Sequence, residues 1–341
     1  MRIVVFSIID DWDIGRLFER SGHEVVAWVR PSWQAQSKPS SWLWGIRHGL
    51  KWALAQDRPI CNIVPRYDVR EWLNARGIPM VACKDANEPE FHEALCEYEP
   101  DLFIVAMYPQ IFKDALLAIP RLGVINYHPS MLPRYAGAQP GFWVLRNGEA
   151  ETGITVHRMT EKIDAGDILM QEVVRIDRDE HIGHLMQKMH HRAAQLILAT
   201  VDAMARGTIC PTAQDGNRRS YFRKKTAADL AIDWNESSEE LLRLLRAVQP
   251  FEPLTTSLRG RAFRIFDAKA MQGGNSGEPG EIVDKVGDSI VVQTGAGRLA
   301  ITNCEIEPFH GWLNRLANRV LVAKGDRFDL VKKGLSRNEG A

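Results

Sequence analysis

Short apolar runs alternate with helical segments through the first part of the chain. Runs with the length and composition of buried parallel strands lie at residues 3–9, 24–29, 78–82, 101–108 and 123–128. Helical segments are expected at residues 15–20, 69–76, 88–97 and 113–119. Strands that alternate with helices in this way predict right-handed β–α–β units, and so a Rossmann-like α/β domain with a mostly parallel sheet.

Two more strands, at residues 152–159 and 168–176, and a long helix at about 181–205 complete this pattern. The pattern then changes. Ser237 and Glu240 form a capping box in front of an apolar helical face. Short β-like runs separated by glycine-rich turns follow (residues 262–266, 280–286, 289–294 and 298–303), with a last helical segment at 312–320. This predicts a smaller, β-rich, OB-like barrel domain.

The length agrees with two domains. At roughly 150 residues per domain, 341 residues give about two. Residues 206–226 have the glycine, proline and basic composition of a connector. We therefore expect a catalytic domain at residues 1–206, a linker at 207–220 and a C-terminal domain at 221–335.

Composition and charge narrow the class of protein. The chain is 45% hydrophobic and 25% charged, which is ordinary for a globular protein. It carries 43 basic and 43 acidic residues, so nucleic acid cannot be bound through bulk charge and would need a local basic patch. The five cysteines are scattered and the N-terminal apolar run is short, from which we expect a cytoplasmic protein without a membrane span.

One segment interrupts the alternation. Residues 31–66 contain four tryptophans and several basic residues between the second and third expected strands. Three interpretations are open: an amphipathic insert packed on the body of the protein, a substrate lid, or a membrane-surface helix. Aromatic residues at helical spacing are most often buried in protein, which favours the first.

Several catalytic and binding motifs are missing. The sequence has no GxxxxGK[ST], GxSxG or HExxH motif. The first strand leads into Ile8-Ile9-Asp10-Asp11, where a dinucleotide-binding fold would have GxGxxG. His184 and His191 share a helical face, but nothing nearby completes a metal site, so no metal is expected.

The densest polar cluster follows the fifth strand. Asn126 and His128 are two residues apart, so both side chains leave the same face of the strand, and Pro129 should end it. Ligands of open α/β sheets bind at this carboxyl edge. Asp164 lies in a polar turn between two later strands, where its carboxylate could return to the same edge and hold the imidazole in one tautomer. The alternatives are an ordinary loop entrance and an ordinary Asp-Gly turn.

An amide, an imidazole and a carboxylate together suit acyl transfer to an amine. The amide can donate to the oxyanion of a tetrahedral intermediate. The imidazole and the carboxylate can move the amine proton to the leaving nitrogen. If the acyl donor is already activated, no serine or cysteine nucleophile is needed.

These residues stand in a longer pattern that resembles a known family. The segments 123–137 (GVINYHPSMLPRYAG), 151–159 (ETGITVHRM) and 163–168 (IDAGDI) are similar to the catalytic domain of the 10-formyltetrahydrofolate-dependent formyltransferases. Residues 232–242 (IDWNESSEELL) resemble the C-terminal domain found in methionyl-tRNA formyltransferases. The resemblance covers nearly the whole chain.

The resemblance implies a site and a co-substrate. It implies that Asn126, His128 and Asp164 are the catalytic triad and that 10-formyltetrahydrofolate donates the formyl group, without a metal. It also implies folate contacts from three segments, comprising Gln110, Ile111 and Phe112; Ser130, Met131, Leu132 and Pro133; and Thr160, Glu161, Lys162 and Ile163.

The acceptor is judged from departures from the family pattern. The turn after the first strand lacks glycine, the tryptophan-rich insert replaces a basic loop, and Ala136 stands where arginine is common. With zero net charge, these differences favour a primary amine or hydroxylamine of a small molecule, such as an amino sugar or an amino acid derivative, over methionyl-tRNA. The basic cluster at residues 218–225 is either a tRNA patch or a solvated linker. A non-catalytic nucleic-acid-binding module is a further alternative, and the oligomeric state is left open.

Overall fold

The computed structural model describes residues 1–9, 14–35, 69–271, 276–309 and 320–329. The chain folds into two compact units that exchange short segments. The first contains Met1–Pro140, Ala150–Ile176 and Met186–Tyr221, and the second Gly141–Glu149, Asp177–Leu185 and Phe222–Ala341. The expected domain boundaries, each at a single point of the sequence, stay predictions. Most of the tryptophan-rich insert, Asp10 and Asp11, and most of the expected helix at 312–320 lie outside the described residues.

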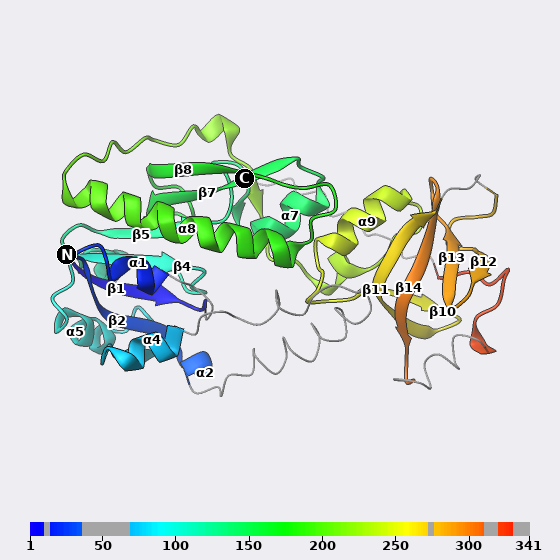
Figure 1. Cartoon of the computed structure of the whole chain (residues 1–341), viewed down its shortest axis with the longest axis horizontal. Coiled ribbons are helices and arrows are strands. Elements are labelled where there is room, and N and C mark those ends of the chain that lie inside the picture. Colours follow the sequence, from blue (N-terminus) through cyan, green and yellow to red (C-terminus); the bar gives the residue numbers. More distant parts are fainter. Residues whose placement is uncertain (10–13, 36–68, 272–275, 310–319, 330–341) are drawn as a thin grey trace. The chain divides into compact units, whose positions relative to one another are not determined.

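A seven-stranded sheet forms the centre of the first unit (Figure 1). Its strands lie in the order β3 (Met80–Cys83), β2 (Glu24–Pro31), β1 (Arg2–Ser7), β4 (Leu102–Ala106), β5 (Val124–His128), β7 (Glu151–Arg158) and β8 (Ile168–Arg175). The first five are parallel, β7 pairs antiparallel with β5, and β8 pairs antiparallel with β7. The prediction of a Rossmann-like, mostly parallel sheet is confirmed.

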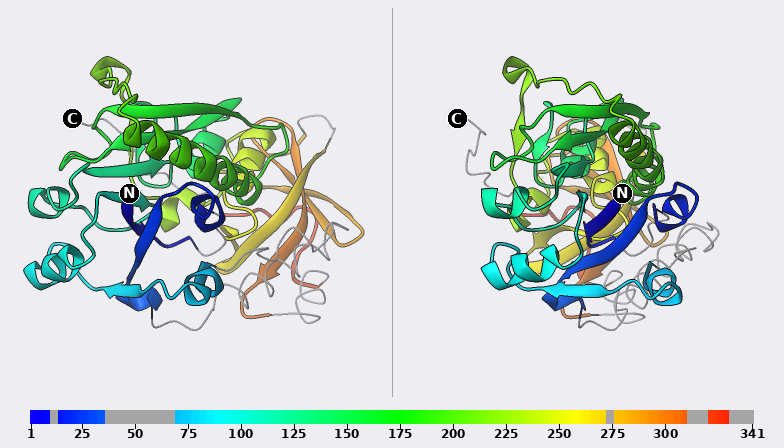
Figure 2. Two further views of the ribbon diagram at one scale, coloured as in Figure 1. Left: turned by 60° about the vertical axis from the view of Figure 1, so that its left-hand side comes forward. Right: turned by 90° about the vertical axis from the view of Figure 1, so that its left-hand side faces the viewer.

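Helices lie between and after the strands, most of them at the helical segments that the apolar pattern predicts. They are α1 (Ile14–Phe18), α2 (Ser32–Ala35), α4 (Val69–Ala75), α5 (Pro89–Cys96), α6 (Asp114–Leu117), α7 (Pro140–Arg146) and α8 (Ile182–Ala205). The long helix α8 runs beside β7 and β8 in every view (Figures 1 and 2), and Arg192 on α8 pairs with Glu172 on β8 at 3.0 Å. Among the residues that the structure describes, no helix is both long and apolar enough to cross a membrane.

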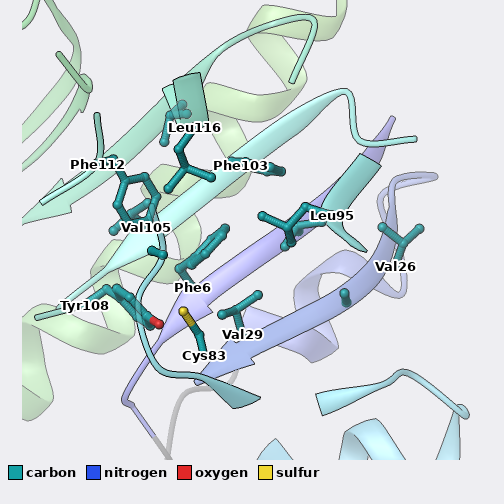
Figure 3. Packing of buried hydrophobic residues seen from close by; sticks show 14 residues of the cluster. Phe6, Val26, Val29, Cys83, Leu95, Phe103, Val105, Tyr108, Phe112 and Leu116 are labelled. Atoms are coloured by element: carbon teal, nitrogen blue, oxygen red, sulfur yellow. The ribbon is translucent and has the colours of Figure 1, made fainter. Parts of the chain in front are cut away.

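The side chains on one face of the sheet form an aromatic core with α5 and α6. Phe6 lies 4.9 Å from Phe112 and 5.2 Å from Phe103 between ring centroids (Figure 3). Val124 at the start of β5 belongs to the same buried cluster. Because side chains alternate along a strand, Asn126 and His128 continue this face towards the carboxyl end of β5. The core therefore fixes the direction in which the two polar side chains point.

The second unit is β-rich, as the sequence predicts. Helix α9 (Ser238–Arg246) begins at the expected capping box, in which Ser237 accepts from the Glu240 N–H and the Glu240 carboxylate accepts from the Ser237 N–H. A five-stranded antiparallel sheet follows, in the order β10 (Leu254–Leu258), β11 (Arg261–Met271), β14 (Arg298–Ile306), β13 (Ser289–Gln293) and β12 (Ile282–Val286). Strand β10 was not expected, because its Leu-Thr-Thr-Ser-Leu sequence lacks a β-like apolar run.

Candidate active site

Strand β5 presents Asn126 and His128 at the carboxyl edge of the sheet. They alternate with Tyr127, which faces the opposite way and meets His190 of α8 at 6.1 Å between ring centroids. Pro129 follows directly and, having no N–H, cannot continue the ladder. Both expectations from the two-residue spacing, a shared face and a strand end at His128, are confirmed.

The His128 ring is enclosed and oriented by the backbone. It is 5% exposed, and its Nε2–H donates to the Tyr135 carbonyl at 2.9 Å. The neutral ring therefore has its lone pair on Nδ1, which lies 3.6 Å from Oδ2 of Asp164. We expected the carboxylate to fix the tautomer. The Tyr135 carbonyl does so instead, because 3.6 Å is too long for a direct hydrogen bond to Asp164.

The loop after Pro129 is folded back so that this carbonyl can reach the ring. The Ser130 hydroxyl is fully buried and donates to the carbonyl oxygens of Arg134 at 2.9 Å and Tyr135 at 3.2 Å. Tyr135 itself has a φ of 58°, in the left-handed region that a bulky residue rarely adopts. Such a conformation persists only where the surroundings hold it, which makes this loop a built part of the site.

The loop between β7 and β8 leaves the sheet beside the amino end of β5, because Arg158 pairs with Ile125, and not at the carboxyl edge as expected. Asp164 reaches His128 from this loop. Its φ is 49°, again left-handed, and its Oδ2 accepts from the Gly137 N–H at 2.9 Å. Gly166 follows where a side chain cannot fit, because a Cβ there would lie 2.0 Å from the Arg158 carbonyl oxygen. The expected convergence of Asp164 on His128 is present in the structure.

Replacing Gly166 by alanine should therefore displace this loop. The clash is with backbone, so we expect the free energy of unfolding to fall by about 1–3 kcal/mol, as overpacking of a tight site usually costs. Urea denaturation of Gly166→Ala measures it. Gly216→Ala is the matched control, because nothing lies within 4 Å of a Cβ at that position. Equal losses in the two variants would contradict the explanation.

His157 belongs to the same cluster, although the sequence analysis did not select it. The register of β5 and β7 places it directly opposite Asn126, and it is 1% exposed. Its Nδ1–H donates to the Arg158 carbonyl at 2.8 Å, and in that tautomer Nε2 accepts from the Asn126 amide at 3.1 Å. The same Nε2 lies 3.6 Å from Oδ1 of Asp164. His157 thus orients Asn126 and leaves the second amide N–H available to donate.

Electrostatic interactions and burial determine the protonation states of His128 and Asp164. Burial lowers the pKa of His128, with smaller contributions from His157 and Arg219, and these outweigh the opposing effects of Asp164 and the Tyr135 carbonyl. Burial acts to raise the pKa of Asp164, but the facing His128 and His157 rings and the Gly137 N–H hold it down at about 2. Near neutral pH the site therefore contains a neutral imidazole, able to accept a proton, beside a permanent carboxylate.

Several of the side chains expected to contact folate are already engaged within the protein. Gln110 accepts from the Ala86 N–H at 2.7 Å and donates to the Lys84 carbonyl at 2.9 Å. Phe112 is fully buried in the core beside Phe6. Ser130 uses its hydroxyl within its own loop. Their contribution to folate binding stays a prediction.

The other expected folate residues lie nearer to solvent or support the loop. Thr160, Glu161, Lys162 and Ile163 are exposed, Met131 is half-buried, and Leu132 and Pro133 are buried. Ile111 is 58% exposed and Ile163 is 42% exposed, and Met107, directly after β4, is 38% exposed. These apolar side chains suit a flat, partly apolar ligand.

Comparison with known proteins agrees with the geometry. Residues 62–201 match the family described as Formyl transferase, and residues 224–310 match Formyl transferase, C-terminal domain. The chain is 35% identical over 226 residues to the methionyl-tRNA formyltransferase of Roseiflexus castenholzii, covering 66% of this chain and 72% of that relative. It is also 35% identical over 231 residues to that of Citrifermentans bemidjiense, covering 68% and 72%.

Solved structures share the fold at low sequence identity. The sugar 3N-formyl transferase WlaRD, solved with dTDP and 5-N-formyl-THF, aligns with a TM-score of 0.61 at 14% identity, over 91% of this chain and 99% of that one. HypX from Aquifex aeolicus, in complex with tetrahydrofolic acid, aligns with a TM-score of 0.58 at 17% identity. The match covers 90% of this chain and 44% of HypX, so the chain spans less than half of that protein.

Proposed function

The chain belongs to the formyl transferase family, whose members use a formyl-folate, and we propose that it transfers the formyl group of 10-formyltetrahydrofolate to a primary amine. The observation that carries this proposal is the juxtaposition of His128 Nδ1 and the Asp164 carboxylate at 3.6 Å, next to the Asn126 amide. The products are an N-formyl compound and tetrahydrofolate.

Each residue has a distinct part in the proposed reaction. The amine nitrogen attacks the formyl carbon, and the free N–H of Asn126 donates to the oxyanion that develops. Nδ1 of His128 takes the amine proton, and Asp164 stabilises the imidazolium that results. The same proton then passes to N10 of the folate as the carbon–nitrogen bond to N10 breaks. The formyl carbon is then bonded to the acceptor nitrogen in place of N10, and the reaction changes no net charge.

For the acceptor we propose methionyl-tRNA first. The relatives that match at 35% identity, over 72% of their length, bear the name methionyl-tRNA formyltransferase. This reverses the order expected from the sequence alone, which favoured a small amine. The support comes from those relatives and not from a basic surface of this chain.

A small-molecule amine, such as an amino sugar, is the second candidate because two of the five residues of the basic cluster are paired with carboxylates of the protein. Arg223 forms a bidentate pair with Asp229 at 2.7 and 2.9 Å, and Lys225 pairs with Glu252 at 2.6 Å. Charges that are already neutralised by carboxylates contribute little to phosphate binding. These two ion pairs therefore have a structural role within the protein.

One assay separates the candidates. Tetrahydrofolate release is measured with 10-formyltetrahydrofolate and either methionyl-tRNA, a panel of amino sugars and amino acid derivatives, or no acceptor. Release only with methionyl-tRNA, with an apparent affinity that falls steeply as salt rises, supports the first acceptor. Release only with a small amine supports the second, and equal release without acceptor indicates a hydrolase. Failure to bind folate in calorimetry would leave a non-catalytic module.

His157 should act on the reaction through Asn126. We expect His157→Leu, which removes the acceptor of the amide N–H, to lower kcat about 10–100-fold, part of what loss of an oxyanion donor costs. In Asn126→Ala the same substitution should have little further effect, because residues acting as one unit are not additive. Kinetics of the two single variants and the double variant measure this coupling. Fully additive losses would show that His157 acts by another route.

A further inference from the structure

The segment at residues 212–220, predicted as a linker, contacts both loops that surround His128. It begins with Thr212, whose backbone exchanges two hydrogen bonds of 2.8 Å with Ile168 at the start of β8. It ends at Ser220, before Tyr221 completes the first unit. The contacts between these two points involve side chains as well as backbone.

Gln214 fixes the loop that carries Asp164. Its amide donates one N–H to the Asp164 carbonyl at 2.9 Å and the other to the Gly166 carbonyl at 2.7 Å. Arg219 adds hydrogen bonds from its guanidinium to the carbonyls of Ile163 at 2.8 Å and Asp164 at 3.3 Å. Four hydrogen bonds from these two side chains therefore converge on the carbonyls of the turn that holds Asp164 at positive φ.

Ser220 fixes the loop that carries Tyr135. The Ser220 hydroxyl oxygen accepts from the Tyr135 N–H at 2.8 Å, and its carbonyl accepts from the Ala136 N–H at 2.9 Å. Its own N–H donates to the Pro133 carbonyl at 3.2 Å. The Ser220 backbone carbonyl thus holds the peptide unit whose oxygen binds His128, and the Ser220 hydroxyl holds the peptide unit before it.

We propose that Gln214 and Ser220 are positioning residues for His128: they hold in place its two partners, the Asp164 carboxylate and the Tyr135 carbonyl. The role in catalysis rests on the proposed formyl transfer, whereas the geometric role does not. Both partners adopt left-handed conformations that need external support, and this segment supplies it to both. The expected linker is then part of the catalytic machinery.

The two side chains offer a clean test because they carry no charge. The charged and titratable groups facing His128 are Asp164 from the β7–β8 loop, His157 from β7 and Arg219 from the segment itself. Asp164 and the Tyr135 carbonyl both act to raise the pKa of His128. Loosening either partner through an uncharged residue should therefore lower that pKa. A merely structural role elsewhere would leave it unmoved.

The experiment uses the full chain with Gln214→Ala and Ser220→Ala. Ser220→Thr, which keeps the hydroxyl oxygen, is the conservative variant, and Gln195→Ala on the exposed surface of α8 is the matched glutamine control. The pKa of His128 is read by NMR titration of labelled histidine rings, with the resonance assigned by its loss in His128→Gln. In parallel, kcat and KM for 10-formyltetrahydrofolate are measured.

We expect the pKa of His128 to fall in both alanine variants, with kcat lowered about 10–100-fold and KM changed much less, as for a small misplacement of a catalytic group. Ser220→Thr and Gln195→Ala should retain the wild-type values. A pKa that is unchanged or raised in the alanine variants overturns the proposal. If Gln214→Ala does not fold, Ser220→Ala decides alone. If the wild type transfers no formyl group, the proposed function fails, while the titration still decides the positioning role.

Discussion

Replacing His128 by glutamine is expected to lower kcat for formyl transfer about 10²–10⁴-fold, the usual contribution of general acid–base catalysis. This corresponds to roughly 3–5 kcal/mol of barrier. The reason is that Nδ1 is the group in the site placed to take the amine proton, while Nε2–H is occupied by the Tyr135 carbonyl. Glutamine can keep a donor to that carbonyl but supplies no base. Steady-state release of tetrahydrofolate measures the change.

His23 provides the control for this experiment. It forms a similar buried imidazole–carboxylate pair, in which Nε2 lies 2.8 Å from Oδ1 of Asp202, with a side chain that is 8% exposed. It lies directly before β2, at the amino edge of the sheet and away from the carboxyl edge that carries the site. His23→Gln should leave kcat close to that of the wild type. If His128→Gln retains wild-type kcat, the proposed mechanism is wrong.

The second large effect is expected for Asp164→Asn. The amide oxygen can still accept from the Gly137 N–H, so the loop should keep its shape. The charge that stabilises the imidazolium is lost, and we expect kcat to fall about 10²-fold or more, as when a general base loses its charged partner. Thermal unfolding should show that the variant is folded before kinetics are compared.

The pH profile distinguishes this loss of charge from a loss of structure. In the wild type the acid limb of kcat/KM should lie below the ordinary histidine pKa of about 6.5, because burial lowers the pKa of His128. The carboxylate opposes that lowering, so its removal should move the acid limb to still lower pH. A limb that moves to higher pH in Asp164→Asn would contradict the assigned roles.

The stabilisation that Asp164 gives the folded state, with its pKa at about 2, should be lost in the wild type as pH falls from about 4 towards 2.

Local spacing was enough to predict part of the site. Asn126 and His128 are two residues apart on a strand that ends at a proline, and this alone determines their shared face and their place at the edge. The approach of Asp164 to His128 was also expected from its place in a turn between two strands, although that turn lies at the amino end of β5 and not at the carboxyl edge. Period and strand polarity are local properties, and for this reason they can be derived without a structure.

The remaining parts of the site depend on register and on contacts over long sequence distances. His157 was visible as one residue of a strand, but only the pairing of β5 with β7 places it opposite Asn126. The Tyr135 carbonyl, a backbone group, has no residue type that would reveal it. The composition of residues 206–226 favours a connector, which stays a prediction, and it contains nothing to predict the bonds from Gln214 and Ser220 to loops about 50 and 85 residues earlier.

The exchange of short segments between the two units limits how the chain can be divided. The chain passes from one unit to the other after residues 140, 149, 176, 185 and 221. The C-terminal unit includes Arg146, which pairs with Glu236 at 2.6 Å, and Gly183, which donates to the Gln249 carbonyl at 3.1 Å. A protease cut or a gene fusion point within residues 207–220 would separate the C-terminal unit from its segments at 141–149 and 177–185. It would also disrupt the contacts of Gln214 and Ser220 with the loops around His128. The sequence distinguishes the two units, but we expect them to be inherited together in one chain.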